Sequence, residues 1–123
     1  MVQSQAILIC TLKEYGFFCM EGAIPAIQAE RFLMAQKILQ RTDLVFQPLR
    51  ELCCERPISQ HTSLYIEGYE RLSSTGQSLG YFYDFYKATY LFGSQPTRVK
   101  VYGTHLSQKK LLSIVKGFSF LIH

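Results

Sequence analysis

The side chains best suited to chemistry in this sequence are six cations that crowd its last third. The stretch after Asp84 holds six Lys or Arg and no carboxylate, whereas the stretch up to Asp84 holds seven Lys or Arg against nine Asp or Glu, which together give the net charge of +4. A basic segment without internal counter-charges repels itself, and an anionic partner relieves that repulsion. The pattern therefore predicts an anion-binding site. Its candidate residues are Lys87, Arg98, Lys100, Lys109, Lys110 and Lys116.

Two neighbouring elements are expected to carry most of these cations. Apolar and basic residues alternate along Thr97–Tyr102, which predicts a half-buried strand with a basic outer face. A helix capped by Ser107 or Thr104 follows, and Lys109 and Lys110 fall in its first turn if Ser107 is the cap. The helix dipole disfavours cations there, but the N–H groups of a helix start and two ammonium groups together make a phosphate cradle. Simple solvation of the charges is the alternative interpretation.

Aromatic side chains just upstream indicate a second contact surface. Tyrosine can bury its ring and keep its hydroxyl in water, so it occurs in cores and at contact surfaces alike. Rings beside cations can also stack on the bases of single-stranded nucleic acid. The run does not match the RNP1 pattern, because Phe82 stands where a small residue is required, so no RNA-recognition motif is predicted. The candidates for stacking or partner contact are Tyr81, Tyr83, Tyr86 and Tyr90, with core packing as the alternative.

One side chain is a candidate for covalent chemistry, the thiol of Cys54. Cations such as Arg50 and Arg56 lower the pKa of a nearby thiol, whereas Glu51 and Glu55 oppose that effect. The sequence contains no nucleophile elbow, no zinc-protease signature, no phosphate-binding glycine loop and no zinc-ligand spacing. We therefore expect a non-enzymatic protein with no catalytic residues, no metal and no cofactor.

The residues before this cysteine form a recognisable succession. Ala29–Leu33 is followed by Phe46–Leu52 and then by a cysteine. This order is similar to that of small ferredoxin-like sulfur or selenium carrier domains, in which a helix leads into a proline–arginine–glutamate turn before Cys-Gly. Here Glu55 follows Cys54 where that family has glycine, and the likeness covers under a quarter of the chain. The resemblance implies a ferredoxin-like topology and a carrier role for Cys54.

Length and composition predict one globular domain spanning residues 1–123. Hydrophobic residues make up 48% of the chain, too many for a disordered segment. No signal peptide and no apolar run of bilayer length is visible. The four cysteines include no C-x-x-C pair, and the neighbours Cys53 and Cys54 are poorly placed to bridge each other. We therefore expect an intracellular protein of a reducing compartment, either the cytoplasm or an organelle matrix, without membrane contact.

The expected elements interleave strands and helices, which predicts an α+β fold. Strands are expected at residues 6–12, 17–20, 44–46, 63–67, 97–102 and 118–122. A hairpin loop is expected between the first two, where Gly16 can adopt the left-handed conformation, and one long strand kinked at Gly16 is the alternative. Helices are expected at residues 25–41 and from Ser107 to Gly117, with a helical turn at 49–55. A helix is also favoured at residues 79–92, with a strand as the alternative because Tyr and Phe prefer strands. We predict a two-layer sandwich in which two to three helices cover a mixed or antiparallel sheet of about five strands. A ferredoxin-like arrangement is the alternative topology.

These observations favour a non-enzymatic binding domain. We expect a small subunit of an RNA-containing or other multi-subunit assembly, which contacts RNA or another polyanion through its basic C-terminal region. A protein–protein adaptor is the alternative, in which a Tyr/Phe-rich surface and the basic region meet an acidic protein partner. A third hypothesis is a small thiol-based carrier or redox protein that uses Cys54.

Overall fold

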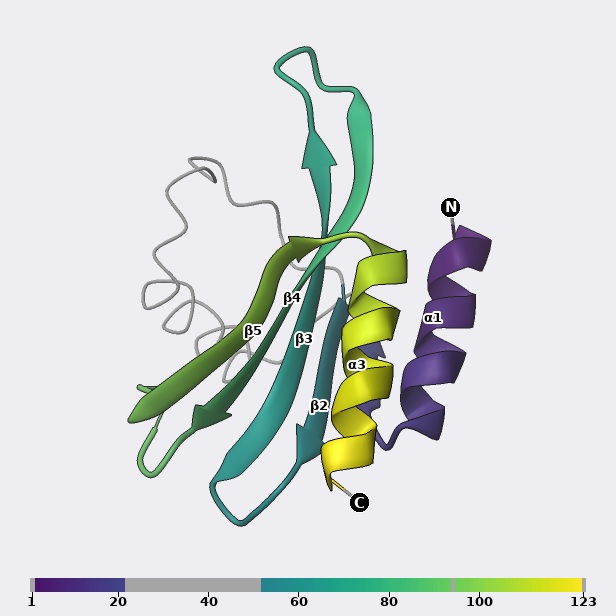
Figure 1. Cartoon of the computed structure of the whole chain (residues 1–123). Helices are drawn as coiled ribbons and strands as arrows, with labels where there is room; N and C mark the ends of the chain where they lie inside the picture. The colour runs from purple at the N-terminus through teal and green to yellow at the C-terminus, as the bar shows by residue number, and fades with distance from the viewer. Residues whose placement is uncertain (1, 22–51, 94, 123) are drawn as a thin grey trace.

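The computed structural model describes residues 2–21, 52–93 and 95–122 and shows an open antiparallel sheet with two helices (Figure 1). The strands follow one another across the sheet in chain order, and every neighbouring pair is antiparallel. The α+β class is confirmed. The ferredoxin-like alternative is not, because that topology requires crossovers between strands. The full layering of the predicted sandwich is not confirmed either, because residues 22–51 lie outside the described part.

The elements are α1 (Val2–Glu14), β1 (Phe18–Glu21), β2 (Leu52–Pro57), β3 (Thr62–Leu72), β4 (Ser78–Thr89), β5 (Arg98–Leu106) and α3 (Gln108–Ile122).

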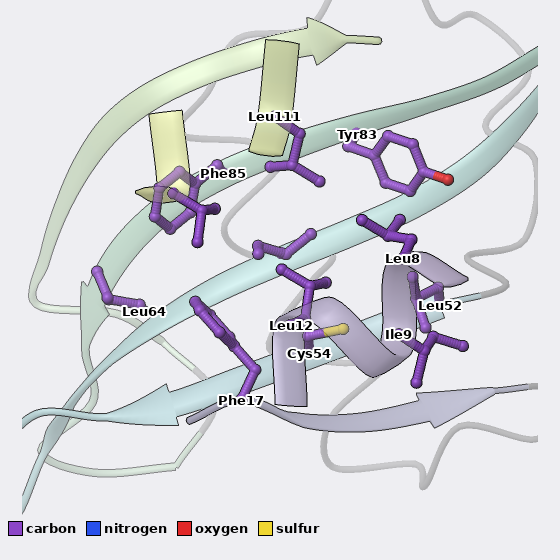
Figure 2. Close-up of a cluster of buried hydrophobic side chains, with 12 residues drawn as sticks. Leu8, Ile9, Leu12, Phe17, Leu52, Cys54, Leu64, Tyr83, Phe85 and Leu111 are labelled. Carbon is purple, nitrogen blue, oxygen red and sulfur yellow. The ribbon is translucent and has the colours of Figure 1, made fainter. Parts of the chain in front are cut away.

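Both helices pack against the same side of the sheet, which we call the helix-covered face. Leu8 and Leu12 of α1 are fully buried there, together with Leu111 of α3 and Phe85 of β4. Figure 2 shows these side chains converging between the helices and the strands. Removing apolar surface from water contributes about 25 cal/mol per Å², so this cluster is the main stabilising part of the fold.

The opposite side of the sheet, the second face, carries a smaller buried cluster that is rich in tyrosine. Tyr65 stacks on Tyr86 with 5.5 Å between ring centroids, and Tyr90 meets Tyr65 edge-on at 5.9 Å. Successive residues of a strand point to opposite faces. Tyr86 therefore lies on the second face while its neighbour Phe85 lies on the helix-covered face.

The N-terminal apolar run forms the helix α1, so the strand predicted at residues 6–12 is wrong. Leu8, Ile9 and Leu12 are buried while Ile7 is 64% exposed, which is the one-sided stripe of an amphipathic helix. Thr11 Oγ1 donates a hydrogen bond to the carbonyl oxygen of Ile7, 3.0 Å away, one helical turn earlier. The prediction failed because periodicity alone cannot decide whether a short, mostly apolar run is a strand or a helix.

Gly16 ends α1 and directs the chain into β1. Its φ of +90° is left-handed, as expected for this glycine, although a helix and not a strand precedes it. The Gly16 N–H donates to the carbonyl of Lys13 and the Phe17 N–H to that of Leu12, which is the Schellman pattern of helix ends. The strand expected at residues 17–20 is confirmed as β1.

Residues 78–89 form the long strand β4, which overturns the helix predicted at 79–92. Tyr83 and Phe85 are buried on the helix-covered face, and Tyr86 and Ala88 are buried on the second face. A strand covered on both sides shows no apolar–polar alternation. The aromatic spacing therefore imitated a helical period, whereas the strand preference of Tyr and Phe prevailed.

The helix α3 continues past Gly117, where an end and a closing strand at residues 118–122 were predicted. Phe118 extends the buried stripe of Leu111 and Val115 and meets Phe85 edge-on at 5.9 Å. Burial of an aromatic ring outweighs the cost of a glycine in a helix, which is about 1 kcal/mol. The expected closing strand is therefore the last turns of a helix.

The remaining predictions for the elements have different outcomes. The strands expected at residues 63–67 and 97–102 are confirmed within β3 and β5. The helical turn expected at 49–55 is wrong in its described part, because β2 begins at Leu52. The helix expected at 25–41 and the strand expected at 44–46 lie outside the described residues, as do most residues that resemble the carrier domains.

Candidate functional site

Three of the predicted cations lie on the helix-covered face of β4 and β5. Lys87 and Lys100 stand directly opposite each other in the register of these strands. Lys87 is two positions after Phe85, and Lys100 is two positions before Tyr102, so each lysine shares a face with that ring. The ring centroids of Phe85 and Tyr102 are 5.2 Å apart on the helix-covered face. By the same alternation Arg98, two positions before Lys100, lies on this side and is exposed.

The other three predicted cations are on α3. Of the two predicted caps, Ser107 is the one that the structure uses, because the backbone N–H of Lys110 donates to Ser107 Oγ at 3.2 Å. Lys109 and Lys110 therefore occupy the first turn, at the positive end of the helix dipole. Both are exposed, as is Lys116. Neither β5 nor α3 contains a carboxylate side chain.

Aromatic contacts bring the cations of the sheet next to α3. Lys100 Nζ lies over the ring of Tyr102, 5.6 Å from its centroid, and Tyr102 meets Phe118 at 4.7 Å. The half of α3 that carries Phe118 therefore lies beside the sheet cations. Lys116 precedes Phe118 by two residues, about 200° around the helix, so it lies on the side of α3 that faces away from Tyr102. Lys109 lies about 10 Å from Lys116 along the helix axis, given a rise of about 1.5 Å per residue. We call the six cations together the basic face.

The tyrosines predicted as stacking or partner residues are mostly buried. The exposed fractions of Tyr83, Tyr86 and Tyr90 are 1%, 0% and 5%. Tyr81 is half-buried and packs against the core of the helix-covered face. A base cannot stack on a ring that is already packed on both sides. Their burial favours the alternative interpretation of these four residues, core packing.

A solvent-facing ring that the sequence pattern did not single out is Phe92, which is 85% exposed. It lies in the connection between β4 and β5, and this loop is closed by a hydrogen bond of 2.8 Å from the Thr97 N–H to the Thr89 carbonyl. Arg98 pairs with Thr89 at the base of the loop. Phe92 is thus held beside the basic face. If residues 79–92 had been predicted to be a strand, Gly93 would have indicated a loop after it, and Phe92 would have been a candidate exposed ring in that loop.

The second face holds titratable groups that no sequence motif indicated. Glu67 of β3 and Asp84 of β4 stand opposite each other in register, and both are fully buried. Like charges in this position destabilise a sheet, and a buried carboxylate requires hydrogen bonds. The two acids are far apart in the sequence, so only strand pairing reveals them. The available signal was an acid within each aromatic strand, namely Asp84 in β4 and Glu67, which is followed by Glu70, in β3.

Hydrogen bonds compensate the burial of both acids. The Tyr86 hydroxyl donates a hydrogen bond to the Glu67 carboxyl group, and the backbone N–H of His105 donates to Asp84 Oδ1 at 3.0 Å. The Tyr69 hydroxyl lies 3.4 Å from both Asp84 Oδ1 and His105 Nδ1. Burial, and then the charge of Glu67, raise the pKa of Tyr86 well above its ordinary value, so this phenol keeps its proton. The five residues, which we call the polar cluster, can donate and accept protons within the sheet.

The cysteine of the third hypothesis is part of the helix-covered core. Cys54 is 1% exposed, and its Sγ lies 2.8 Å from Sγ of Cys19. The adjacent Cys53 points to the second face. Arg50, a predicted neighbour of the thiol, lies outside the described residues. Within the described ranges, no group of three or more His, Cys, Asp or Glu side chains has a geometry that could hold a metal ion.

No protein-family model matches the chain, and neither a curated protein nor a solved structure matches it. Neither helix of the described part combines the length and apolar composition that a bilayer crossing requires. Any functional conclusion therefore depends on the geometry of the side chains.

Proposed function

We propose that this chain is a non-enzymatic binding domain for single-stranded RNA, acting as a small subunit of an RNA-containing assembly. The observation that carries the proposal is the opposition of Lys87 and Lys100 across β4 and β5. Like charges in directly opposite positions destabilise a sheet, and cross-strand pairs of this kind contribute roughly 0.2–1 kcal/mol. A phosphate between the two ammonium groups converts that repulsion into attraction.

The rest of the basic face supports the same ligand. Lys109 and Lys110 add two ammonium groups to the capped start of α3, where N–H groups and the helix dipole favour anions. Phe92 adds an exposed ring beside Arg98, and stacking of one base on such a ring contributes about 1–3 kcal/mol. An unpaired strand is favoured over a duplex because its bases can leave one another and stack on the protein. Contacts to phosphates fix position without reading sequence, so we expect weak sequence preference.

Fluorescence anisotropy with a labelled single-stranded RNA of mixed sequence tests the proposal. If three or four phosphates are neutralised, the logarithm of the binding constant falls with the logarithm of salt concentration at a slope of roughly −2 to −3. Single-stranded DNA and double-stranded RNA of equal length serve as competitors, and the duplex is expected to compete less well. A flat salt titration would contradict the proposal.

Charge reversal separates binding from folding. The double variant Lys109→Glu/Lys110→Glu should lose RNA affinity. Lys87→Glu should also lose affinity, but it replaces the opposed lysines with an attractive pair, so its stability should not fall. Lys13→Glu on α1, outside the basic face, changes the net charge as much as Lys87→Glu does and should bind almost normally. Equal affinity for all three and the parent protein would reject the basic face as the site.

The ring of Phe92 is tested in the same assay. Phe92→Ala should weaken binding by about tenfold, near the low end of the range for one stacked base. Leu79→Ala removes another exposed apolar side chain, 54% exposed, at the far end of β4 and should leave affinity unchanged.

A protein–protein adaptor is the second candidate, favoured by one specific observation. Among the described strands β5 is an edge of the sheet, and Val101 on it is 44% exposed. An extended segment of a partner can add to such an edge through main-chain hydrogen bonds. This function predicts association that depends weakly on salt and is reduced by Val101→Lys, as measured by analytical ultracentrifugation with the native partner.

A further inference from the structure

We propose that Cys19 and Cys54 form a reversible oxidation site, at which a peroxide converts the two thiols into a disulfide between β1 and β2. The inference is independent of RNA binding, because it concerns the opposite edge of the described sheet from β5. It also differs from the carrier hypothesis for Cys54, since it requires a second cysteine that the sequence does not place nearby.

Strand register supplies the first argument. Cys19 pairs with Cys54 in the antiparallel ladder of β1 and β2. Residues directly opposite in such a ladder have Cα atoms about 4.5–5.5 Å apart. Natural disulfides join Cα atoms about 4.4–6.8 Å apart, so the backbone already has the required separation.

The side chains supply the second argument. The Cys54 thiol donates to Cys19 Sγ with 2.8 Å between the sulfur atoms, well inside the contact distance of two sulfurs that are not bonded. Both side chains lie on the helix-covered face, where Cys54 belongs to the buried core and Cys19 packs at its margin. Figure 2 shows the Cys54 sulfur among the core side chains near Leu12. Bond formation needs only a small displacement within one packed layer.

The other two cysteines are excluded as partners by their positions. Cys53 points to the second face, where Met20 stands opposite it. Cys10 is exposed on α1. The bond is therefore expected to be specific for one of the six pairs that four cysteines allow.

The reaction consumes one peroxide molecule and starts at the more accessible thiol. Cys19 is partly exposed and Cys54 buried, so the thiolate of Cys19 attacks the peroxide. The O–O bond breaks, an S–O bond forms, and the departing oxygen takes up a proton and leaves as water. The Cys54 sulfur then attacks Cys19, an S–S bond replaces the S–O bond, and the hydroxyl leaves as water with the Cys54 proton. The two sulfurs lose one electron each and the peroxide gains both; a thiol reductant reverses the bond by exchange.

The test is oxidation of the reduced full-length chain with hydrogen peroxide, followed by alkylation, intact mass measurement and peptide mapping. Exposed Cys10 is an internal standard, and the dose is raised until it is oxidised. At that dose we expect most molecules to carry one internal cross-link that joins the peptides of Cys19 and Cys54, with a loss of two hydrogens. Dithiothreitol should restore the original mass.

Single variants identify the pair. Cys10→Ser and Cys53→Ser should form the cross-link as the parent does, whereas Cys19→Ser and Cys54→Ser should not. Oxidised Cys10 with Cys19 and Cys54 still alkylated would overturn the proposal, and so would a cross-link that uses Cys53. Fragmentation of the cross-linked peptide of the parent protein, which distinguishes Cys54 from the adjacent Cys53, decides the question even if Cys54→Ser fails to fold.

Discussion

The Tyr86 hydroxyl donates to the carboxyl group of Glu67, and both side chains are fully buried. Tyr86→Phe removes this donor and leaves the buried acid with one hydrogen bond fewer. The free energy of unfolding of the variant should be about 1–3 kcal/mol lower than that of the parent protein, as measured by urea titration. Tyr15→Phe removes a hydroxyl from a half-buried ring outside the polar cluster and should change stability little. If both variants lose the same free energy of unfolding, the hydrogen bond from the Tyr86 hydroxyl to Glu67 does not stabilise the fold.

The same tyrosine gives the protein a dependence on alkaline pH. Burial and Glu67 raise the pKa of Tyr86 in the folded state above that of the unfolded chain, which is about 10. The folded protein therefore holds this proton more tightly, and the resulting stability is complete below about pH 10 and lost as pH rises through the folded pKa. Above about pH 10, the parent protein should lose stability more steeply than Tyr86→Phe, as measured by urea unfolding at a series of pH values.

At the scale of elements, Gly117 is a weak point inside α3. It is exposed, and a Cβ there would meet no atom within 4 Å. Gly117→Ala should therefore stabilise the protein by about 1 kcal/mol and raise its thermal midpoint. Gly80→Ala is the matched control, because the space around Gly80 is equally open but its φ is +104°. That variant should be destabilised, and a gain in both would show that backbone conformation is not the cause.

The errors in predicting α1 and β4 have a common physical origin. A period is visible only when one side of an element is apolar and the other polar. β4 is buried on both faces, and the run of α1 includes the exposed Ile7 beside the buried Leu8. In both elements tertiary packing, and not the local pattern, selected the conformation. The strand of residues 97–102 was predictable because its basic side faces solvent.

At the scale of the whole molecule, oxidation should stabilise the fold. Cys19 and Cys54 are 35 residues apart, and closing a loop of that length removes unfolded-state entropy that corresponds to about 4 kcal/mol. The peroxide-treated parent should therefore unfold at a higher urea concentration than the reduced parent. Cys19→Ser given the same treatment should show no gain, and a parent protein without any gain would contradict a bond that closes this loop.

Local features were readable from the chain before folding. The α+β class, the basic strand, the left-handed Gly16 and a cap at Ser107 or Thr104, of which the structure uses Ser107, each depend on residues that are neighbours in the sequence. Composition and charge order were sufficient for these, because turn and cap preferences act over a few residues.

Pairs of distant residues became visible only in the folded chain. Strand register joins positions that are separated in the sequence, and a slip of one residue would turn every side chain to the other face. No local preference encodes that register, since it results from burying both faces of the sheet at once. The cross-strand pairs that depend on it are Lys87 with Lys100, Glu67 with Asp84, and Cys19 with Cys54.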